Sequence, residues 1–303
     1  MNKKYLIAVV GPTAIGKTSM GIELARHFNT EIISADSRQF YKEMQIGTAV
    51  PSEAELKAAR HHFIQHISVE EDYSVGDFER DAIQRLQELF LKHDVVVMVG
   101  GSGLYIDAVV KGLDEFPEVD PQIRLNLKEE LEQEGLGNLQ EELKTLDTEY
   151  YSEVDLQNPQ RVIRALEICR GTGKPYSDFR KKNTKNRFFD TLYVGISAER
   201  EIIYERINRR VDIMMQQGLL EEVKSVFMKR ELNALNTVGY KEIFKYLDAQ
   251  WDLDTAVSEI KKNTRRFAKR QLTWFRKNEA INWFDAETPP QEIITAIQKK
   301  ITL

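Results

Sequence analysis

One eight-residue segment, Gly11 to Thr18, constrains this chain more than any other. It reads Gly-Pro-Thr-Ala-Ile-Gly-Lys-Thr and stands between an apolar run at 6–10, typical of a buried strand, and helical spacing from about Gly16 to Phe28. Glycines there let backbone N–H groups turn toward phosphate oxygens, Lys17 adds positive charge, and the Thr18 hydroxyl can bind Mg²⁺. We therefore predict a loop that binds a diphosphate or nucleotide, with Mg²⁺ on Thr18, formed by Gly11, Pro12, Thr13, Ala14, Ile15, Gly16, Lys17 and Thr18.

Further apolar runs predict the rest of a sheet. They lie at 31–35, 95–99 and 192–196, with a weaker candidate at 62–64. Helical spacing at 77–92 and after Ser102 separates them. Strands that alternate with helices indicate βαβ units and a parallel sheet.

The middle of the chain has a different pattern. Residues 117–188 contain four prolines, show helical periodicity and contain no convincing strand. From Ala198 onward every segment has helical periodicity, at about 199–216, 219–230, 239–248 and 253–278. The expected fold is therefore α/β: a P-loop-type parallel sheet flanked by helices, a helical insertion domain at 117–188 and a helical C-terminal region. Residues 1–116 and 189–303 would form the core.

Composition restricts the cellular context. The 43 Lys and Arg against 48 Asp and Glu give a net charge of -5, which argues against a uniformly basic coat but leaves local basic surfaces possible. One cysteine, Cys169, can form neither an internal disulfide nor a cysteine-type zinc site. No apolar run approaches the roughly 20 residues of a membrane span, and the run at 6–10 is shorter than a signal-peptide core. We expect a cytoplasmic protein without membrane contact.

The strand ends carry the candidate chemistry. A typical P-loop NTPase has a second apolar strand that ends in an acid, but the run at 95–99 ends in Gly100-Gly101-Ser102. The acid at a strand end is Asp36. Ligands of open parallel sheets gather at the carboxyl ends of strands, so Asp36 and Ser102 should meet the phosphate loop there. Each could instead be a helix cap or turn residue.

A basic stretch near the end of the chain suggests a polyanionic ligand. Residues 261–277 carry eight Lys and Arg and no acid, with Phe267, Trp274 and Phe275 among them. Such a stretch can bind nucleic-acid phosphates. The alternative is a solvated helix face with an aromatic stripe that packs into the core. His61, His62 and His66 are close in sequence, but no acid or cysteine nearby has ligand spacing, so we interpret them as structural.

In the phosphate loop, around Asp36 and Ser102, and in several later segments, the chain resembles the bacterial tRNA dimethylallyltransferases, also called tRNA isopentenyltransferases. The matching segments occur in family order over nearly the whole chain. Ser102 stands where many members have threonine, and it keeps the hydroxyl. The matching segments are 11–18, 36–41, 46–51, 100–105, 120–124, 158–167, 173–174, 238–240 and 269–274.

The resemblance implies a reaction. Family members transfer a dimethylallyl group from dimethylallyl diphosphate to N6 of the adenosine 3′-adjacent to the anticodon, in tRNAs that read codons beginning with U, and release diphosphate. It implies that Asp36 is the general base, that Ser102 orients the target base, and that Arg210, with Arg206 nearby, reaches the diphosphate. With Lys17 and Thr18, and with Mg²⁺ as cofactor, these residues form the expected catalytic set. ATP could also bind, because the loop recognises phosphate rather than a base.

The resemblance also implies the partners. They are dimethylallyl diphosphate and the tRNA anticodon stem-loop. Separately from the resemblance, we expect a monomer. The implied tRNA contacts are Asp36, Ser37, Arg38, Gln39, Ser102, Arg124, Gln160, Arg161, Val162, Ile163, Arg164, Asn236, Thr237, Val238, Gly239, Tyr240, Lys241, Lys269, Arg270, Gln271, Leu272, Thr273, Trp274, Phe275 and Arg276.

Two other functions share some of these features. A P-loop kinase for a small molecule or nucleotide would use the same loop, with Arg206 and Arg210 over the phosphoryl group. The missing acid-ended strand and the basic stretch at 261–277 argue against it. A nucleotide-gated RNA-binding module without chemistry would not need a carboxylate, Asp36, where a polyanion docks.

Overall fold

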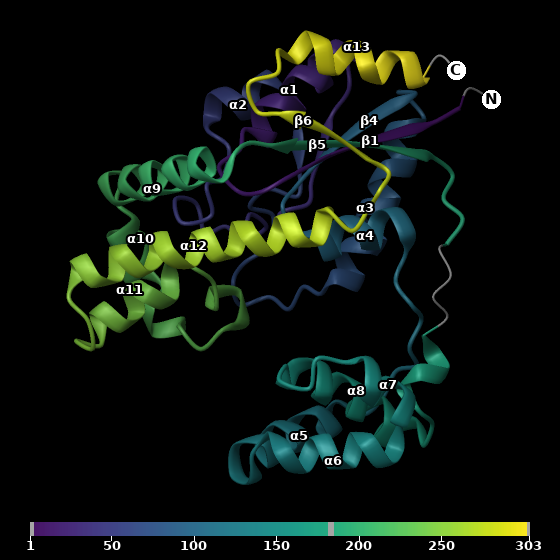
Figure 1. The fold of residues 1–303 in the computed structure, drawn as a ribbon, viewed down its shortest axis with the longest axis vertical. Helices are drawn as coiled ribbons and strands as arrows, with labels where there is room; N and C mark the ends of the chain where they lie inside the picture. Colours follow the sequence, from purple (N-terminus) through teal and green to yellow (C-terminus); the bar gives the residue numbers. More distant parts are fainter. Residues whose placement is uncertain (1–2, 181–184, 302–303) are drawn as a thin grey trace. The chain divides into compact units, whose positions relative to one another are not determined.

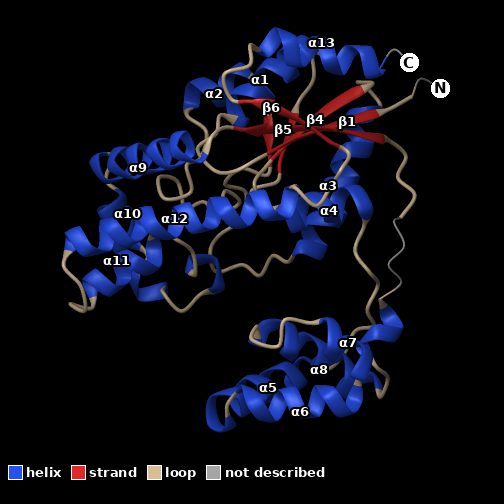
Figure 2. Ribbon diagram, in the orientation of Figure 1, coloured by secondary structure: helices blue, strands red, loops and turns tan. Residues whose placement is uncertain are grey.

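The computed structural model describes residues 3–180 and 185–301, and within them one parallel sheet contains six strands in the order β3-β2-β4-β1-β5-β6. Figure 2 shows the sheet with helices on both sides. The predicted α/β class with a P-loop-type parallel sheet is confirmed. The strands are β1 (Tyr5–Val10), β2 (Ile32–Ser34), β3 (His61–His62), β4 (Val95–Val99), β5 (Asp190–Ser197) and β6 (Ile281–Asp285).

The register of the central strands brings their three carboxyl ends to the same level of the sheet. Val9 pairs with Val99 of β4, and Val10 pairs with Gly195 of β5. The loops that follow β1, β4 and β5 therefore begin side by side. Every residue of β1 is buried, because alternate side chains enter two hydrophobic cores on opposite faces of the sheet.

Helices cover both faces (Figure 1). One core receives apolar side chains from α3, α4, α10 and α11, and the other receives them from α1 and α13, while α9 and α12 contribute to both. The bounds are α1 (Lys17–His27), α2 (Glu53–Ala58), α3 (Val75–Phe90), α4 (Gly103–Lys111), α9 (Arg200–Gln216), α10 (Leu219–Ser225), α11 (Tyr240–Leu247), α12 (Leu253–Phe275) and α13 (Pro290–Ile301), with short 3₁₀ turns at Phe227–Lys229 and Asn233–Leu235. Among these described helices, none is both long enough and apolar enough to cross a membrane.

The chain forms two compact units, one of residues 1–111 with 186–303 and one of residues 112–185. The sequence analysis placed the boundaries at 116/117 and 188/189, and residues 181–184 of that expected insertion lie outside the described part. The second unit contains α5 (Pro121–Glu134), α6 (Leu136–Leu146), α7 (Thr148–Glu153), α8 (Pro159–Thr172) and a 3₁₀ turn at Tyr176–Phe179.

Helix α8 shows how the insertion's sequence directs its fold. Asn158 caps the first turn by accepting hydrogen bonds from two backbone amides, and Pro159 occupies the first helical position. The helix ends at Gly173, whose φ of 69° lies in the left-handed region. Its buried face packs with Leu127 of α5 and Leu139 of α6 in a core of the unit's own.

The expectation that everything after Ala198 is helical is wrong. Strand β6 pairs in parallel with β5, with Tyr193 opposite Ile281. The strand was missed because it lies at the sheet edge, where only Ile281 is buried and the next four residues are partly or fully exposed. Five residues with one buried side chain do not show the alternation or the apolar run that indicates a strand.

Candidate functional site

The phosphate loop adopts a conformation that its sequence requires. Gly11 has a φ of 145°, and a Cβ atom there would lie 2.3 Å from the carbonyl oxygen of Ile196, so no other residue fits. Gly16, at φ 103°, leads directly into α1, whose first turn carries no acidic residue. The N-terminus of α1, which is its positive end, therefore faces the loop, and no acidic side chain in the first turn offsets that charge. The Lys17 ammonium donates to the Pro12 carbonyl oxygen at 2.6 Å, which leaves two of its protons for a ligand.

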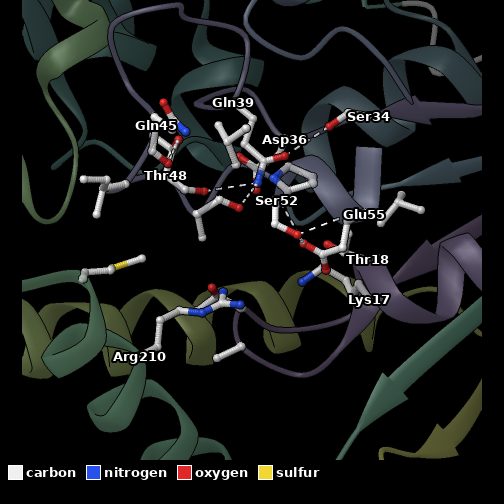
Figure 3. A pocket seen from close by; sticks show the side chains of 18 of the residues that line it. Lys17, Thr18, Ser34, Asp36, Gln39, Gln45, Thr48, Ser52, Glu55 and Arg210 are labelled. Carbon is white, nitrogen blue, oxygen red and sulfur yellow. Dashed lines mark hydrogen bonds between the residues drawn. The ribbon is translucent and has the colours of Figure 1, made fainter. Parts of the chain in front are cut away.

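A cavity of about 700 Å³ opens in front of this loop, and we call it the first cavity. Figure 3 shows the side chains of Lys17, Thr18, Asp36 and Arg210 around it. The loop supplies one wall, the segment 45–52 supplies another, and α9 supplies Arg210, Ile213 and Met214.

Three charged groups interact across the first cavity. Burial raises the pKa of the Asp36 carboxyl above its ordinary value, although the Arg38 amide and the charges of Lys17 and Arg210 oppose this. Burial lowers the pKa of Lys17 to about 8, and the Arg210 charge adds to that effect while Asp36 opposes it. The carboxylate and the ammonium are thus both shifted toward neutrality.

Asp36 lies where β2 ends, in a turn rather than at a helix. Its carboxylate accepts a hydrogen bond from the Arg38 amide at 3.2 Å, and its carbonyl accepts one from the Gln39 amide at 3.0 Å. The adjacent Ala35 amide donates to the Val99 carbonyl, which ties this turn to the end of β4. The sheet therefore holds the carboxylate at the cavity.

Ser102 lies beside this turn, as the sequence predicts. Its hydroxyl oxygen accepts from the Ser37 amide at 3.1 Å and lies 3.2 Å from the Ser37 hydroxyl. Ser102 does precede α4, and its carbonyl accepts hydrogen bonds from the amides of Tyr105 and Ile106 in the first turn of that helix. The hydrogen-bond partners of its side chain, however, are the amide and hydroxyl of Ser37 in the Asp36 turn.

A second cavity, of about 560 Å³, adjoins the first. The two share Thr13, Asp36, Thr48, Ala49, Arg210 and Met214 as lining residues, so Asp36 faces both. Many of the predicted tRNA contacts line this second cavity: Asp36, Ser37, Arg38, Ser102, Asn236, Thr237, Val238, Gly239, Lys241, Arg270, Gln271 and Trp274.

Arg38 and Gln271 have structural partners in addition to facing the cavity. The Arg38 guanidinium donates to the backbone carbonyls of Asn233 at 3.0 Å and Ala234 at 2.8 Å, so it holds the loop that leads into 236–239. Gln271 is buried and joins Thr13 to Gly101. A side chain at Gly101 would displace the Gln271 amide, because a Cβ there would lie 2.3 Å from its nitrogen.

The other predicted contacts lie elsewhere. Gln39 lines the first cavity, and its amide donates to the carbonyls of Thr48 and Ala49. On α12, Lys269, Thr273 and Arg276 are exposed outside the cavity, whereas Phe275 is buried and Leu272 half-buried. Tyr240 is fully buried, so its side chain offers no surface.

In the second unit, the predicted contacts cluster on α5 and α8. Arg124 and Arg164 both donate to the buried Glu167 carboxylate, at 2.9 and 3.0 Å, and Arg124 reaches the Gln160 amide oxygen at 3.4 Å. Arg161 is exposed. Val162 and Ile163 are fully buried, so their side chains support the helix rather than offering a binding surface.

Sequence reasoning missed part of the site. The first cavity is also lined by residues 45–46 and 48–52, His61, Met214, Gln217 and Glu222. The sequence patterns place none of them in the site, and they indicate a structural role for His61. The motif at 46–51 was the available signal, because it matched the family pattern. Glu222 gave no signal, since it is one of many acids on amphipathic helices. Arg206 supports the loop through the Ile15 carbonyl at 3.4 Å, while Arg210 faces both cavities.

Comparisons with known proteins agree on one family. The family described as IPP transferase matches residues 39–278. A tRNA dimethylallyltransferase of Christiangramia forsetii is 61% identical over 98% of each chain, and one of Flavobacterium johnsoniae is 54% identical over 98% of each.

Solved structures show the same likeness. The tRNA isopentenylpyrophosphate transferase of Bacillus halodurans matches with a TM-score of 0.74 and 36% identity, over 99% of this chain and 97% of that one. A eukaryotic dimethylallyltransferase acting on tRNA matches with a TM-score of 0.82 and 26% identity, over 99% of this chain and 78% of that one.

Proposed function

The chain belongs to the IPP transferase family, and we propose that it transfers a dimethylallyl group from dimethylallyl diphosphate to N6 of the adenosine 3′-adjacent to the anticodon in tRNAs that read codons beginning with U, releasing diphosphate. Prenyl transfer to tRNA is the activity that its relatives carry in their names. The observation that supports the finer proposal is that two cavities meet at Asp36 and Arg210. One would hold the donor and the other the acceptor base.

The first cavity suits an allylic diphosphate. The phosphate loop, Lys17 and Arg210 supply positive charge and N–H groups for the diphosphate, and Ile213 and Met214 offer apolar surface for the five-carbon chain. As the bond between the allylic carbon and oxygen breaks, the leaving diphosphate gains negative charge. Preorganised donors stabilise that charge more in the transition state than in the ground state.

The residues present also fit Mg²⁺. Thr18 offers a hydroxyl oxygen in the first cavity, and Mg²⁺ prefers oxygen ligands together with substrate phosphates. No cluster of three or more His, Cys, Asp or Glu that could hold a metal occurs in residues 3–180 and 185–301, so the diphosphate and water would complete the shell. When bound, Mg²⁺ would neutralise part of the diphosphate charge.

In this proposal Asp36 removes the proton from the acceptor. The adenine N6 amine is a weak nucleophile because its lone pair is delocalised into the ring. N6 attacks the allylic carbon, the carbon–oxygen bond breaks with its electrons leaving on diphosphate, and the N6 proton goes to Asp36. Burial raises the pKa of this carboxyl, which makes it a stronger base. Ser37 and Ser102 line the second cavity, as Asp36 does, and their hydroxyls would orient the adenine.

The second cavity suits an adenine that has left its stack. Unstacking a base costs a few kcal/mol, which phosphate contacts can offset. Arg270 and Trp274 of α12 line this cavity, and Trp274 can stack on a base. On the second unit, the exposed Arg161 can contribute a separate phosphate contact.

We propose that the protein acts as a monomer. The buried, unpaired Cys169 is compatible with the reducing cytoplasm, where we place the enzyme. Elution from a calibrated sizing column, with and without tRNA, tests the monomer.

One assay tests the proposed function against the kinase alternative, which the likeness to tRNA-modifying transferases disfavours. The protein is mixed with Mg²⁺, unmodified total tRNA and either dimethylallyl diphosphate labelled in the five-carbon group or γ-labelled ATP. We expect the five-carbon label in a modified adenosine of digested tRNA and no transfer of the γ-phosphate. Label from ATP on any acceptor would contradict the proposal.

A further inference from the structure

The Glu222 carboxylate of α10 accepts four hydrogen bonds. One oxygen accepts from the backbone amides of Gln45 at 3.0 Å and Ile46 at 2.7 Å. The other accepts from the Gly47 amide at 2.8 Å and the Tyr240 hydroxyl at 2.6 Å. Three consecutive backbone N–H groups thus converge on one side chain that lies far away in the sequence.

These amides belong to the segment 45–50, which walls the first cavity and whose residues Gly47, Thr48 and Ala49 also line the second. A second side chain holds the far end of the segment, because Gln39 donates to the carbonyls of Thr48 and Ala49 at 3.1 and 2.9 Å. Gln39 follows directly on the Asp36 turn. The wall is therefore attached at one end to the turn that carries the proposed base and at the other to α10.

The segment 45–50 packs closely against the side chain of Tyr240. Tyr240 is fully buried, and a Cβ on Gly47 would lie 2.6 Å from its ring. The segment can approach Glu222 this closely because residue 47 has no side chain. The Tyr240 hydroxyl donates the fourth hydrogen bond, so each oxygen of the Glu222 carboxylate accepts two.

We propose that Glu222 is a positioning residue that holds the 45–50 wall against the donor, and this rests on the proposed function. A carboxylate suits the task because it accepts at both oxygens. A glutamine in its place would turn an NH₂ group toward backbone N–H donors, which repel it. The wall would then lose its attachment to α10, and the donor would bind a less ordered surface.

The experiment compares Glu222→Gln with Glu221→Gln. Glu221 is the neighbouring residue, is 70% exposed, and has a long ion pair with Lys224 at 3.8 Å, so the two variants make the same chemical change one position apart. For each variant we measure hydrogen exchange of the peptide that contains 45–47, the melting temperature, and kcat and KM for dimethylallyl diphosphate.

We expect Glu222→Gln to speed exchange in that peptide selectively and to raise the KM for dimethylallyl diphosphate about tenfold or more, with a smaller change in kcat. Glu221→Gln should match the wild type. Tyr240→Phe, which removes one of the four hydrogen bonds, should give a smaller change of the same kind and serves as the test if Glu222→Gln does not fold.

Two results would overturn the inference. In the first, Glu222→Gln has the same hydrogen exchange at 45–47 and the same KM for dimethylallyl diphosphate as Glu221→Gln. In the second, Glu222→Gln speeds hydrogen exchange throughout the protein and lowers kcat generally. If the wild type itself transferred no prenyl group, the proposed function would fail. The selective exchange at 45–47 would still decide whether Glu222 holds the wall.

Discussion

The side-chain oxygen of Gln271 accepts a hydrogen bond from the backbone amide of Thr13 at 2.8 Å. The amide nitrogen of the same side chain donates to the Gly101 carbonyl at 3.0 Å. Gln271 is buried on α12, the helix that also carries Arg270 and Trp274. The helix that borders the second cavity is thus fastened to the loop that borders the first.

This connection predicts the effect of Gln271→Met, which keeps the length of the side chain and removes both hydrogen bonds. The buried Gly101 carbonyl would lose its partner, which costs about 1–3 kcal/mol in the free energy of unfolding, and the part-buried Thr13 amide would lose one at a smaller cost. We expect a lower melting temperature and weaker binding of both substrates. Gln291→Met, on the exposed face of α13, is the matched control and should change neither. Wild-type binding of both substrates by Gln271→Met would show that the connection is dispensable.

The dependence of activity on pH should be bell-shaped. The base must be deprotonated, so kcat/KM should rise with pH through the pKa of Asp36, which burial raises. The phosphate loop needs a charged ammonium, so kcat/KM should fall as pH passes the Lys17 pKa of about 8. Because the profile of kcat/KM reports the free enzyme, the fall should appear there. For kcat it should shift to higher pH, since bound diphosphate favours the charged lysine.

The variant Lys17→Met tests the assignment of the alkaline limb. It should be much slower than the wild type at every pH, and its kcat/KM should no longer fall near pH 8. A wild-type profile that stays flat from neutral pH to well above 8 would contradict the role given to Lys17.

The basic stretch of α12 predicts a salt-dependent affinity for tRNA. Each phosphate neutralised adds about 0.7–0.9 to the slope of log K against log salt. Replacing Lys269, which is exposed, and Arg270, which lines the second cavity, with alanine should flatten that slope by roughly one to two and weaken binding. Filter binding across a salt series measures both. An unchanged slope and affinity would indicate that this stretch is only a solvated helix face.

Local patterns predicted much of the architecture. The loop at 11–18 and the strand at 95–99 could be found because a glycine pattern and an unbroken apolar run are visible in a few consecutive residues. The meeting of Asp36, Ser102 and the loop followed from one rule, that carboxyl ends of parallel strands share an edge. Strand β6 escaped because an edge strand with a single buried side chain has no such pattern.

The tertiary roles could not be predicted in the same way. The partners of Gln271 and Arg38 lie 258 and 195 residues away, and nothing local distinguishes a buried glutamine from a surface one. Family resemblance grouped both with the tRNA contacts. The structure adds that Gln271 joins α12 to the phosphate loop and that Arg38 holds the 233–236 loop. Glu222 was missed for the same reason, since its four donors come from two distant segments.

The central claim is that Asp36, where the two cavities meet, is the base for prenyl transfer. Asp36→Asn is the sharpest variant, because the carboxamide oxygen can still accept the hydrogen bond from the Arg38 amide and so preserve the turn. The measurement is the single-turnover rate of dimethylallyl transfer to tRNA at saturating donor, with tRNA affinity measured in parallel. We predict a rate lower by about 10²–10⁴ and an affinity close to that of the wild type. A near-normal rate in the Asp36→Asn enzyme would contradict the account.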